Sequence, residues 1–325
     1  MSESFNLDAD PNRAVQLDRE LRQRLATSLS YALTEFDLLE PVITPRFEAF
    51  LLTLRAAPVD PQVFGIYYDL VLSLEHGQED AAKTLLSELL ELPPPAAGIQ
   101  VKSLADLSAS QRDRYRRQVD TDPNAVMRID PPPAAMREHC ARRIEEALSL
   151  LHEGYPELHA ELHAILREVV IAVSPEVDLA LEFDGASSFL LWGSIALNAQ
   201  GHETRLDTVE ALVHESAHCL LFGLSNTERL LENDNQPRYR SPLRVDPRPL
   251  DGIFHAAFVT ARMHHALATL LERGVLRNEE VAQAEHSLAQ HTSSFCDGVA
   301  TLRRHALLTS LGRTVLEGML RSMPA

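Results

Sequence analysis

The sequence predicts a mostly α-helical protein with a small β-sheet that precedes one central helix, an α+β architecture. Two observations carry this prediction. Apolar side chains recur at the helical positions i, i+3, i+4 and i+7 through most of the 325 residues. One region, near residues 177–198, shows instead the alternation of apolar and polar residues that is typical of strands. Hydrophobic residues make up 45% of the chain, the usual share for a globular protein with a substantial core.

Prolines separate the predicted helices. The first helix is predicted over residues 11–40 and ends at Pro41 and Pro45. Triple prolines at 93–95 and 131–133 mark two further breaks. The other helices are predicted at 47–54, 63–74, 81–92, 112–119, 136–151, 157–173, 253–271 and 281–308.

The predicted sheet lies just before the central helix. From residue 177 to 183, Val, Leu, Leu and Phe alternate with Asp, Ala and Glu, as in a strand with one buried face. Residues 184–188 have the composition of a turn, and residues 189–198 are predicted as a second strand. Residues 93–102 are predicted as a linker or surface loop. The sheet either completes the core or offers an edge to which an extended peptide can pair.

Charge and cysteine content exclude several classes of protein. The net charge of −17 argues against general binding to nucleic acid or to an anionic membrane. The three cysteines, Cys140, Cys219 and Cys296, are too widely spaced for a disulfide framework and favour a reducing compartment. No basic region followed by an apolar run opens the chain, and no run of about 18 apolar residues occurs. We therefore expect a cytoplasmic protein without a signal peptide or a membrane span.

The central helix carries a His-Glu-x-x-His motif, from His214 to His218. On a helix these two histidines stand one turn apart on the same face, so both imidazoles can bind one metal ion. Glu215, next to the first histidine, can reach a metal-bound water. The alternative is a buried helix in which the two histidines are incidental polar residues.

The residues around the motif favour a helix. Asp207 and Glu210 are three positions apart, the spacing of a capping box at a helix start, and Gly223 is placed to help end the helix. A buried face would hold the histidines at fixed angles. The apolar residues at helical spacing are Val209, Leu212, Val213, Ala217, Leu220, Leu221 and Leu224.

A catalytic metal ion usually has three protein ligands, so the motif needs one more. The pattern His-Glu-x-x-His-x-x-Gly-x-x-His fails, because Leu221 and Leu224 stand where its glycine and third histidine belong. Glu228 and Glu232 follow too closely, since the chain must reverse direction before it can reach the same ion. His255 lies 37 residues after the motif, beyond a loop long enough for that reversal, and is the preferred third ligand. Three imidazoles suit zinc and iron alike.

An arginine-bearing loop connects the central helix to the helix of His255. Residues 226–251 are polar and rich in proline, and they carry Arg238, Arg240, Arg244 and Arg248 in an otherwise acidic chain. The loop is either a solvated surface or an anion-binding segment, because arginine binds carboxylates through two parallel hydrogen bonds.

Two stretches together resemble a known family. They are LVHESAH at residues 212–218 and YRSPLRVDPRPLDGIFHAAFV at residues 239–259. They resemble the HExxH-motif peptide-modification family, found in gene clusters for ribosomally synthesised peptide natural products (RiPP biosynthesis). Residues 185–198 are similar to the segment that precedes the motif in that family. The resemblance covers about residues 180–262. Its Arg-x-Asp-Pro-Arg-Pro run followed by Gly-x-x-His is more specific than the motif, which unrelated proteases share.

Members of that family are understood as Fe(II)- and 2-oxoglutarate-dependent peptide β-hydroxylases, a class of dioxygenase that acts on precursor peptides. The resemblance implies that His214, His218 and His255 ligate Fe(II). Such an ion keeps up to three open positions, two for 2-oxoglutarate and one for dioxygen. The usual set in non-haem iron oxygenases is two histidines and one carboxylate, so a three-histidine site is a departure.

The resemblance also assigns the loop arginines and the motif glutamate. Arg244 or Arg248, or both, would bind the distal carboxylate of 2-oxoglutarate, whose two negative charges need a cation near the metal. Glu215 would orient a metal-bound water or a ligand histidine instead of acting as a general base. The chain would then divide into an N-terminal helical region, 1–130, and an HExxH catalytic region, 131–325.

Two other functions are compatible with the residues. One is a zinc metallopeptidase in which Glu215 is the general base, and the other is a non-catalytic peptide-binding or scaffold protein with a degenerate metal site. The expected partner is a precursor peptide, with no nucleic acid and no membrane, and a homodimer is a possible assembly.

Overall fold

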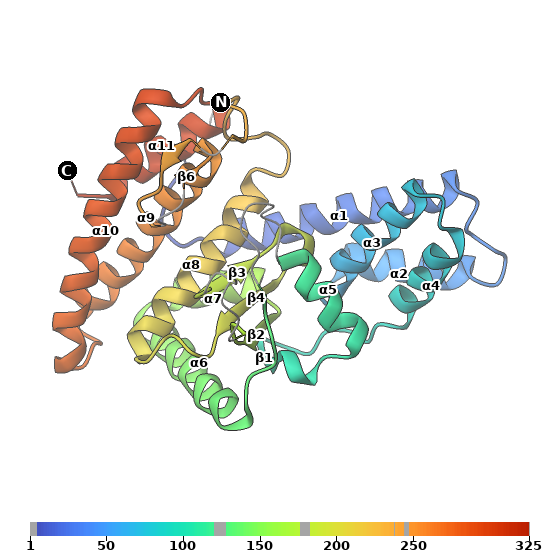
Figure 1. Cartoon of the computed structure of the whole chain (residues 1–325), viewed down its shortest axis with the longest axis horizontal. Coiled ribbons are helices and arrows are strands. Elements are labelled where there is room, and N and C mark those ends of the chain that lie inside the picture. The colour runs from blue at the N-terminus through green and yellow to red at the C-terminus, as the bar shows by residue number, and fades with distance from the viewer. Residues whose placement is uncertain (1–4, 120–127, 176–182, 237, 244–246, 325) are drawn as a thin grey trace. The chain divides into compact units, whose positions relative to one another are not determined.

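The computed structural model describes residues 5–119, 128–175, 183–236, 238–243 and 247–324. These residues form eleven α-helices, a four-stranded mixed sheet and a two-stranded hairpin (Figure 1). All four strands of the larger sheet precede the helix that carries the His-Glu-x-x-His motif. The predicted class, mostly α with a small sheet ahead of that helix, is confirmed.

Two compact units share the chain, and each is formed by separate stretches of sequence. Unit 1 comprises Met1–Pro11, Arg142–Leu162 and His202–Ala325, and unit 2 comprises Asn12–Ala141 and His163–Gly201. The predicted division into an N-terminal region, 1–130, and a catalytic region, 131–325, differs from these two units. It stays a prediction about which part of the chain carries the function.

Unit 2 combines helices with the four-stranded sheet. The strand order is β1-β2-β4-β3, in which β1, β2 and β4 run parallel and β3 runs antiparallel to β4. Its helices are α1 (Pro11–Glu35), α2 (Thr44–Ala56), α3 (Gln62–Glu75), α4 (Glu79–Glu91) and α5 (Ala109–Val119), and its strands are β1 (Gln100–Ser103), β2 (Glu168–Ala172), β3 (Gly185–Ser187) and β4 (Ser194–Asn198).

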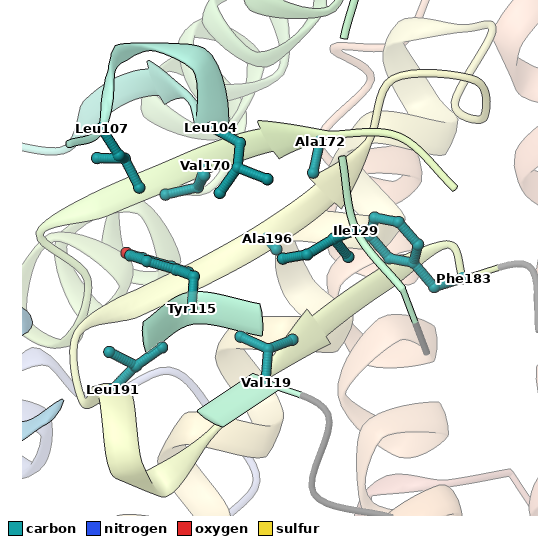
Figure 2. Close-up of a cluster of buried hydrophobic side chains, with 10 residues drawn as sticks. All are labelled: Leu104, Leu107, Tyr115, Val119, Ile129, Val170, Ala172, Phe183, Leu191 and Ala196. Atoms are coloured by element: carbon teal, nitrogen blue, oxygen red, sulfur yellow. The ribbon is translucent and has the colours of Figure 1, made fainter. Parts of the chain in front are cut away.

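Helix α5 covers one face of this sheet. Figure 2 shows Tyr115 and Val119 of α5 packed against side chains of β2 and β4, among them Val170 and Ala196. Burial of these apolar groups contributes roughly 25 cal/mol per Å² removed from water. The same cluster includes Leu104, Leu107, Ile129, Ala172, Phe183 and Leu191.

The sheet differs from its prediction in three places. The helix predicted over 157–173 ends at Ile165, and Glu168–Ala172 is strand β2. All five residues of β2 are buried, and the four after Glu168 are apolar, as in parallel strands covered on both faces, so the stretch shows no alternation and resembles a buried helix. Strand β1 begins within the predicted loop 93–102 and ends just after it, and β3 lies in the predicted turn 184–188.

The two predicted strands have different outcomes. In the segment 189–198 only Ser194–Asn198 is a strand, because Phe189–Leu191 forms a 3₁₀ turn capped by Ser188. The predicted strand 177–183 falls almost wholly outside the described residues, of which it includes only Phe183.

Unit 1 is built around three helices that follow one another along the chain. Helix α9 packs against both α8 and α10 (Figure 1). Ion pairs and hydrogen bonds from Arg205 to Glu280 and from Ser287 to Glu210 set α8 beside α10. The elements are α8 (Arg205–Leu224), β5 (Tyr239–Arg240), β6 (Pro247–Arg248), α9 (Leu250–Glu272), α10 (Asn278–His305) and α11 (Ser310–Ser322); α6 (Ala134–Gly154) and α7 (Pro156–Ile165) have residues in both units.

A buried ion pair anchors α9 within this unit. Arg262 of α9 pairs with Glu161, and its Nη1 also donates a hydrogen bond to the Leu7 carbonyl over 2.5 Å. Arg262 and Glu161 are 3% and 2% exposed, so each charge is neutralised by its partner instead of by water. Helix α9 is thereby fixed to α7 and to the N-terminal segment.

Candidate functional site

Helix α8 holds the His-Glu-x-x-His motif, and its start is defined by a capping box one turn earlier than predicted. Thr204 Oγ1 accepts from the Asp207 backbone N–H over 3.0 Å, and Asp207 Oδ2 accepts from the Thr204 N–H over 2.9 Å. Asp207 therefore closes the box, and the predicted pairing of Asp207 with Glu210 is wrong. The helix ends at Leu224, one residue after Gly223, and the Gly223 carbonyl accepts a hydrogen bond from the N–H of the capping residue Ser225.

The three predicted metal ligands lie together. His218 Nε2 is 3.2 Å from His214 Nε2, and His218 Nδ1 is 3.1 Å from His255 Nδ1. His255 reaches this position from the second turn of α9, which packs against α8. The apolar face of α8 fixes the motif, since six of its seven predicted members are buried and the seventh, Leu224, is half-buried.

The rings form a row with His218 in the middle. His218 presents its Nε2 to one neighbour and its Nδ1 to the other, whereas an ion takes one nitrogen from each ring. Accordingly, among the described residues no group of three or more His, Cys, Asp or Glu side chains is already arranged to hold a metal ion. The donor chemistry of three imidazoles fits a divalent transition metal.

The cluster environment favours neutral imidazoles. Burial, followed by the neighbouring His214 and His255, lowers the pKa of His218 well below its usual value. Burial also lowers the pKa of His255, against an opposing effect of Asp251. A neutral imidazole keeps the lone pair that a metal needs.

Two carboxylates stand at the ends of the row. Glu215 Oε1 is 3.9 Å from His214 Nε2, and Asp251 Oδ2 is 3.8 Å from His255 Nε2. Glu215 is buried, whereas the Asp251 side chain is 53% exposed. Asp251 was not predicted from the sequence, although its position four residues before His255 places both on one face of α9. Asp251 is beside Nε2 of His255 and leaves Nδ1 to face His218, as carboxylates do for metal-ligating histidines, whereas Glu215 lies near the His214 nitrogen that itself faces His218.

An aromatic ring closes one side of the site. The Phe222 ring centroid is 5.4 Å from that of His255 and 6.2 Å from that of His218, on which it stacks. Phe222 was also missed, although it continues the spacing of four residues from His214 through His218. Phe222 therefore packs against two of the three imidazoles.

Of the four arginines in the predicted anion-binding loop, one packs on helix α9, two are exposed and one lies outside the described residues. Arg248 belongs to β6, and its side chain packs over Gly252 in the first turn of α9, one turn before His255. Arg240 of β5 and Arg238 are exposed, and Arg238 pairs with Asp234. Arg244 lies outside the described residues.

The rejected alternatives for the third ligand lie elsewhere. Glu228 is exposed and accepts a hydrogen bond from the Leu311 N–H over 3.2 Å, and Glu232 is exposed.

No protein-family model matches this chain, and no curated protein matches it. None of the helices in the described ranges is long and apolar enough to cross a membrane.

Proposed function

We propose that this protein is an Fe(II)- and 2-oxoglutarate-dependent dioxygenase that hydroxylates a β-carbon in a ribosomally synthesised precursor peptide in the cytoplasm. The observation that carries the proposal is the placement of His255 at 3.1 Å from His218, on the helix that begins beside Arg248. Three imidazoles, with an arginine packed on the first turn of the helix that carries one of them, match the needs of an iron site that also binds a dicarboxylate. The resemblance of residues 212–218 and 239–259 to the HExxH-motif peptide-modification family supports the same function.

Each residue has a defined role in this proposal. His214, His218 and His255 hold Fe(II), which supplies the oxidative chemistry when 2-oxoglutarate and dioxygen are bound. Asp251 orients His255 so that Nδ1 serves the ion. Glu215 orients a metal-bound water or the ring of His214.

Arginine supplies the cosubstrate site. Arg248 binds the distal carboxylate of 2-oxoglutarate, and Arg244 is the second candidate. A planar guanidinium donates two parallel hydrogen bonds to a carboxylate, which a lysine cannot reproduce.

Titration of 2-oxoglutarate into the anaerobic Fe(II)-loaded protein tests this assignment, with the visible charge-transfer absorption as the readout. We expect Arg248→Ala to weaken binding about ten- to a hundred-fold, because a charge-assisted contact contributes roughly 1.5 to 3 kcal/mol. Arg248→Lys should also weaken it. Arg240→Ala, on the neighbouring strand, is the matched control and should leave the affinity unchanged.

Two outcomes would contradict parts of this proposal separately. Unchanged affinity in both Arg248→Ala and Arg244→Ala would reject the role of the loop arginines. Absence of 2-oxoglutarate binding by the unmodified iron-loaded protein would reject the dioxygenase itself.

A zinc metallopeptidase is the second candidate function. Its support is the distance of 3.9 Å between Glu215 Oε1 and the His214 nitrogen that faces His218, which brings the carboxylate towards a metal-bound water. In that case the zinc-loaded protein should cleave a library of fluorogenic peptides, and Glu215→Gln should abolish cleavage. A dioxygenase should cleave none of them.

A further inference from the structure

Unit 1 contains a second group of titratable side chains on the same three helices. Glu210 lies on α8, His264 on α9 and His291 on α10. The proposed dioxygenase uses none of the three. His264 lies nine residues, or two and a half helical turns, after His255, so these two histidines are on opposite faces of α9.

Helix geometry places His264 opposite His291. A Cβ built on Gly298 would lie 3.5 Å from the Cβ of Ala257, which marks a close contact between α10 and α9. The two helices are joined by the short segment 273–277 and therefore run antiparallel. Seven residues are close to two turns, so His264, seven after Ala257, and His291, seven before Gly298, face each other at one level.

Both histidines have a buried nitrogen without a hydrogen-bond partner. His291 is 8% exposed, and its Nδ1 is buried and makes no hydrogen bond with the described residues. The Nδ1 of His264 is in the same condition. Buried polar atoms are almost always satisfied in native proteins, and two such atoms on facing residues are placed to share one partner.

A carboxylate identifies the chemistry of that partner. His291 Nε2 lies 3.0 Å from Glu210 Oε2, and the Ser287 hydroxyl donates to Glu210 Oε1 over 2.9 Å. With its Nε2–H directed at the carboxylate, a neutral His291 has its lone pair on Nδ1. Metal-ligating histidines are oriented by carboxylates in this way.

We propose that His264 and His291 bind a divalent transition-metal ion, of the borderline class that includes Zn(II), through their Nδ1 atoms. This site is separate from the row of His214, His218 and His255, and does not depend on its function. Glu210 is a positioning residue that acts through His291. Water completes the coordination, because two imidazoles are the protein ligands. The ion links α9, which carries His255, to α10.

Zinc binding to the full chain with the first histidine cluster removed tests the proposal. In a His214→Ala/His218→Ala background, isothermal titration with Zn(II) should give one ion per chain. Adding His264→Ala or His291→Ala should reduce this to none. Adding His286→Ala should leave it unchanged, since His286 is an exposed histidine of α10 that pairs with Gln290.

The role of Glu210 has its own readout. Glu210→Gln keeps an oxygen that can accept from His291 Nε2 but removes the charge, and should weaken zinc binding about 10- to 100-fold with the stoichiometry kept at one. Circular dichroism verifies that each variant is folded. If His291→Ala unfolds, the zinc stoichiometry of His264→Ala tests the proposal, because His264 is only half-buried. A background variant that binds no zinc, as expected if the two nitrogens share only a water or a proton, would overturn the proposal. So would one zinc ion that persists in both His264→Ala and His291→Ala.

Discussion

The histidine row of unit 1 and a polar cluster beside the sheet of unit 2 both bury titratable groups, but they satisfy them differently. In unit 2, the sheet cluster consists of Tyr115, Glu168, Lys102 and Ser194. The Tyr115 hydroxyl donates to Glu168, and Lys102 Nζ lies 2.6 Å from the other Glu168 oxygen. Ser194 shares a hydrogen bond with the same hydroxyl.

In the histidine row like groups face one another. His218 is placed between two other imidazoles, and the acidic side chains Glu215 and Asp251 stand only at the ends. Donor and acceptor, or positive and negative charge, alternate in the sheet cluster, so that cluster is complete as it stands. Each neutral imidazole has one N–H and one lone pair, so neighbouring rings can bond in pairs, but only a cation can be shared by all three. The comparison thus separates a cluster of complementary groups from a cluster of identical groups, which is the arrangement expected of a metal site.

Removing the middle of the histidine row should produce the largest functional effect. We expect His218→Ala to reduce metal affinity more than 100-fold, beyond the 10- to 100-fold loss typical of residues that only orient a ligand. Metal content after dialysis of the Fe(II)- or Zn(II)-loaded protein measures it, in a His264→Ala background that removes the second proposed site, and His76→Ala, an exposed histidine of unit 2, is the control. Retention of metal by His218→Ala at unchanged affinity would show that the row is not a metal site.

Breaking the sheet cluster should instead reduce stability. Glu168→Ala leaves Lys102 without its closest ion-pair partner and leaves the Tyr115 hydroxyl with Ser194 alone, and loss of one partner of a buried pair costs about 3 to 5 kcal/mol. We expect the lower end, because the Lys102 side chain is 33% exposed and can turn to water. Urea unfolding followed by circular dichroism measures the change.

The matched control for Glu168→Ala is Glu40→Ala. Glu40 pairs with Lys83 at 3.5 Å on the surface of unit 2, where such a pair contributes less than about 1 kcal/mol. Equal losses in the two variants would contradict the view that the sheet cluster stabilises the fold. In the metal-free protein, His218→Ala should cost less than Glu168→Ala.

The same contrast explains how far the sequence could predict the molecule. Helices were predictable because one-sided burial repeats every 3.6 residues, and prolines mark their ends. Strand β2 was not, because Val169, Val170 and Ile171 are buried on every side and carry no alternation. Strands β1 and β3 are short edge strands, defined by pairing with distant residues and not by their own composition.

Within the candidate site, local spacing was sufficient for part of the assembly. His214 and His218 follow from the motif, and His255 from the need for a third ligand beyond a reversing loop. Asp251 and Phe222 were not predicted, although each lies four residues from a histidine of the row and therefore on the same helix face. Two other features depend on how α8, α9 and α10 pack, and the residue spacing within one helix does not predict them. They are the contacts of both His218 nitrogens with neighbouring rings and the position of His264 opposite His291.

The smallest expected effect concerns Asp60, at the margin of the sheet cluster. Burial, and then the nearby Glu168 carboxylate, raise the pKa of Asp60, while the Gln62 N–H and Lys102 oppose the shift. A raised pKa in the folded state means that the folded protein holds this proton more tightly than the unfolded chain does. The resulting stabilisation is present below the unfolded pKa and is lost as the pH rises through the folded one.

Asp60→Asn should therefore stabilise the protein at pH 7 and not at pH 4. Asparagine removes the disfavoured charge but keeps an oxygen that can accept from the Gln62 N–H, as Asp60 Oδ1 does over 2.9 Å. Loss of the weak 4.0 Å contact with Lys102 limits the gain to about 1 kcal/mol or less. Urea midpoints of both proteins at the two pH values measure it. A variant less stable than the parent at pH 7 would mean that the ion pair with Lys102 outweighs repulsion from Glu168, and that the sheet cluster extends its alternation of charges to Asp60.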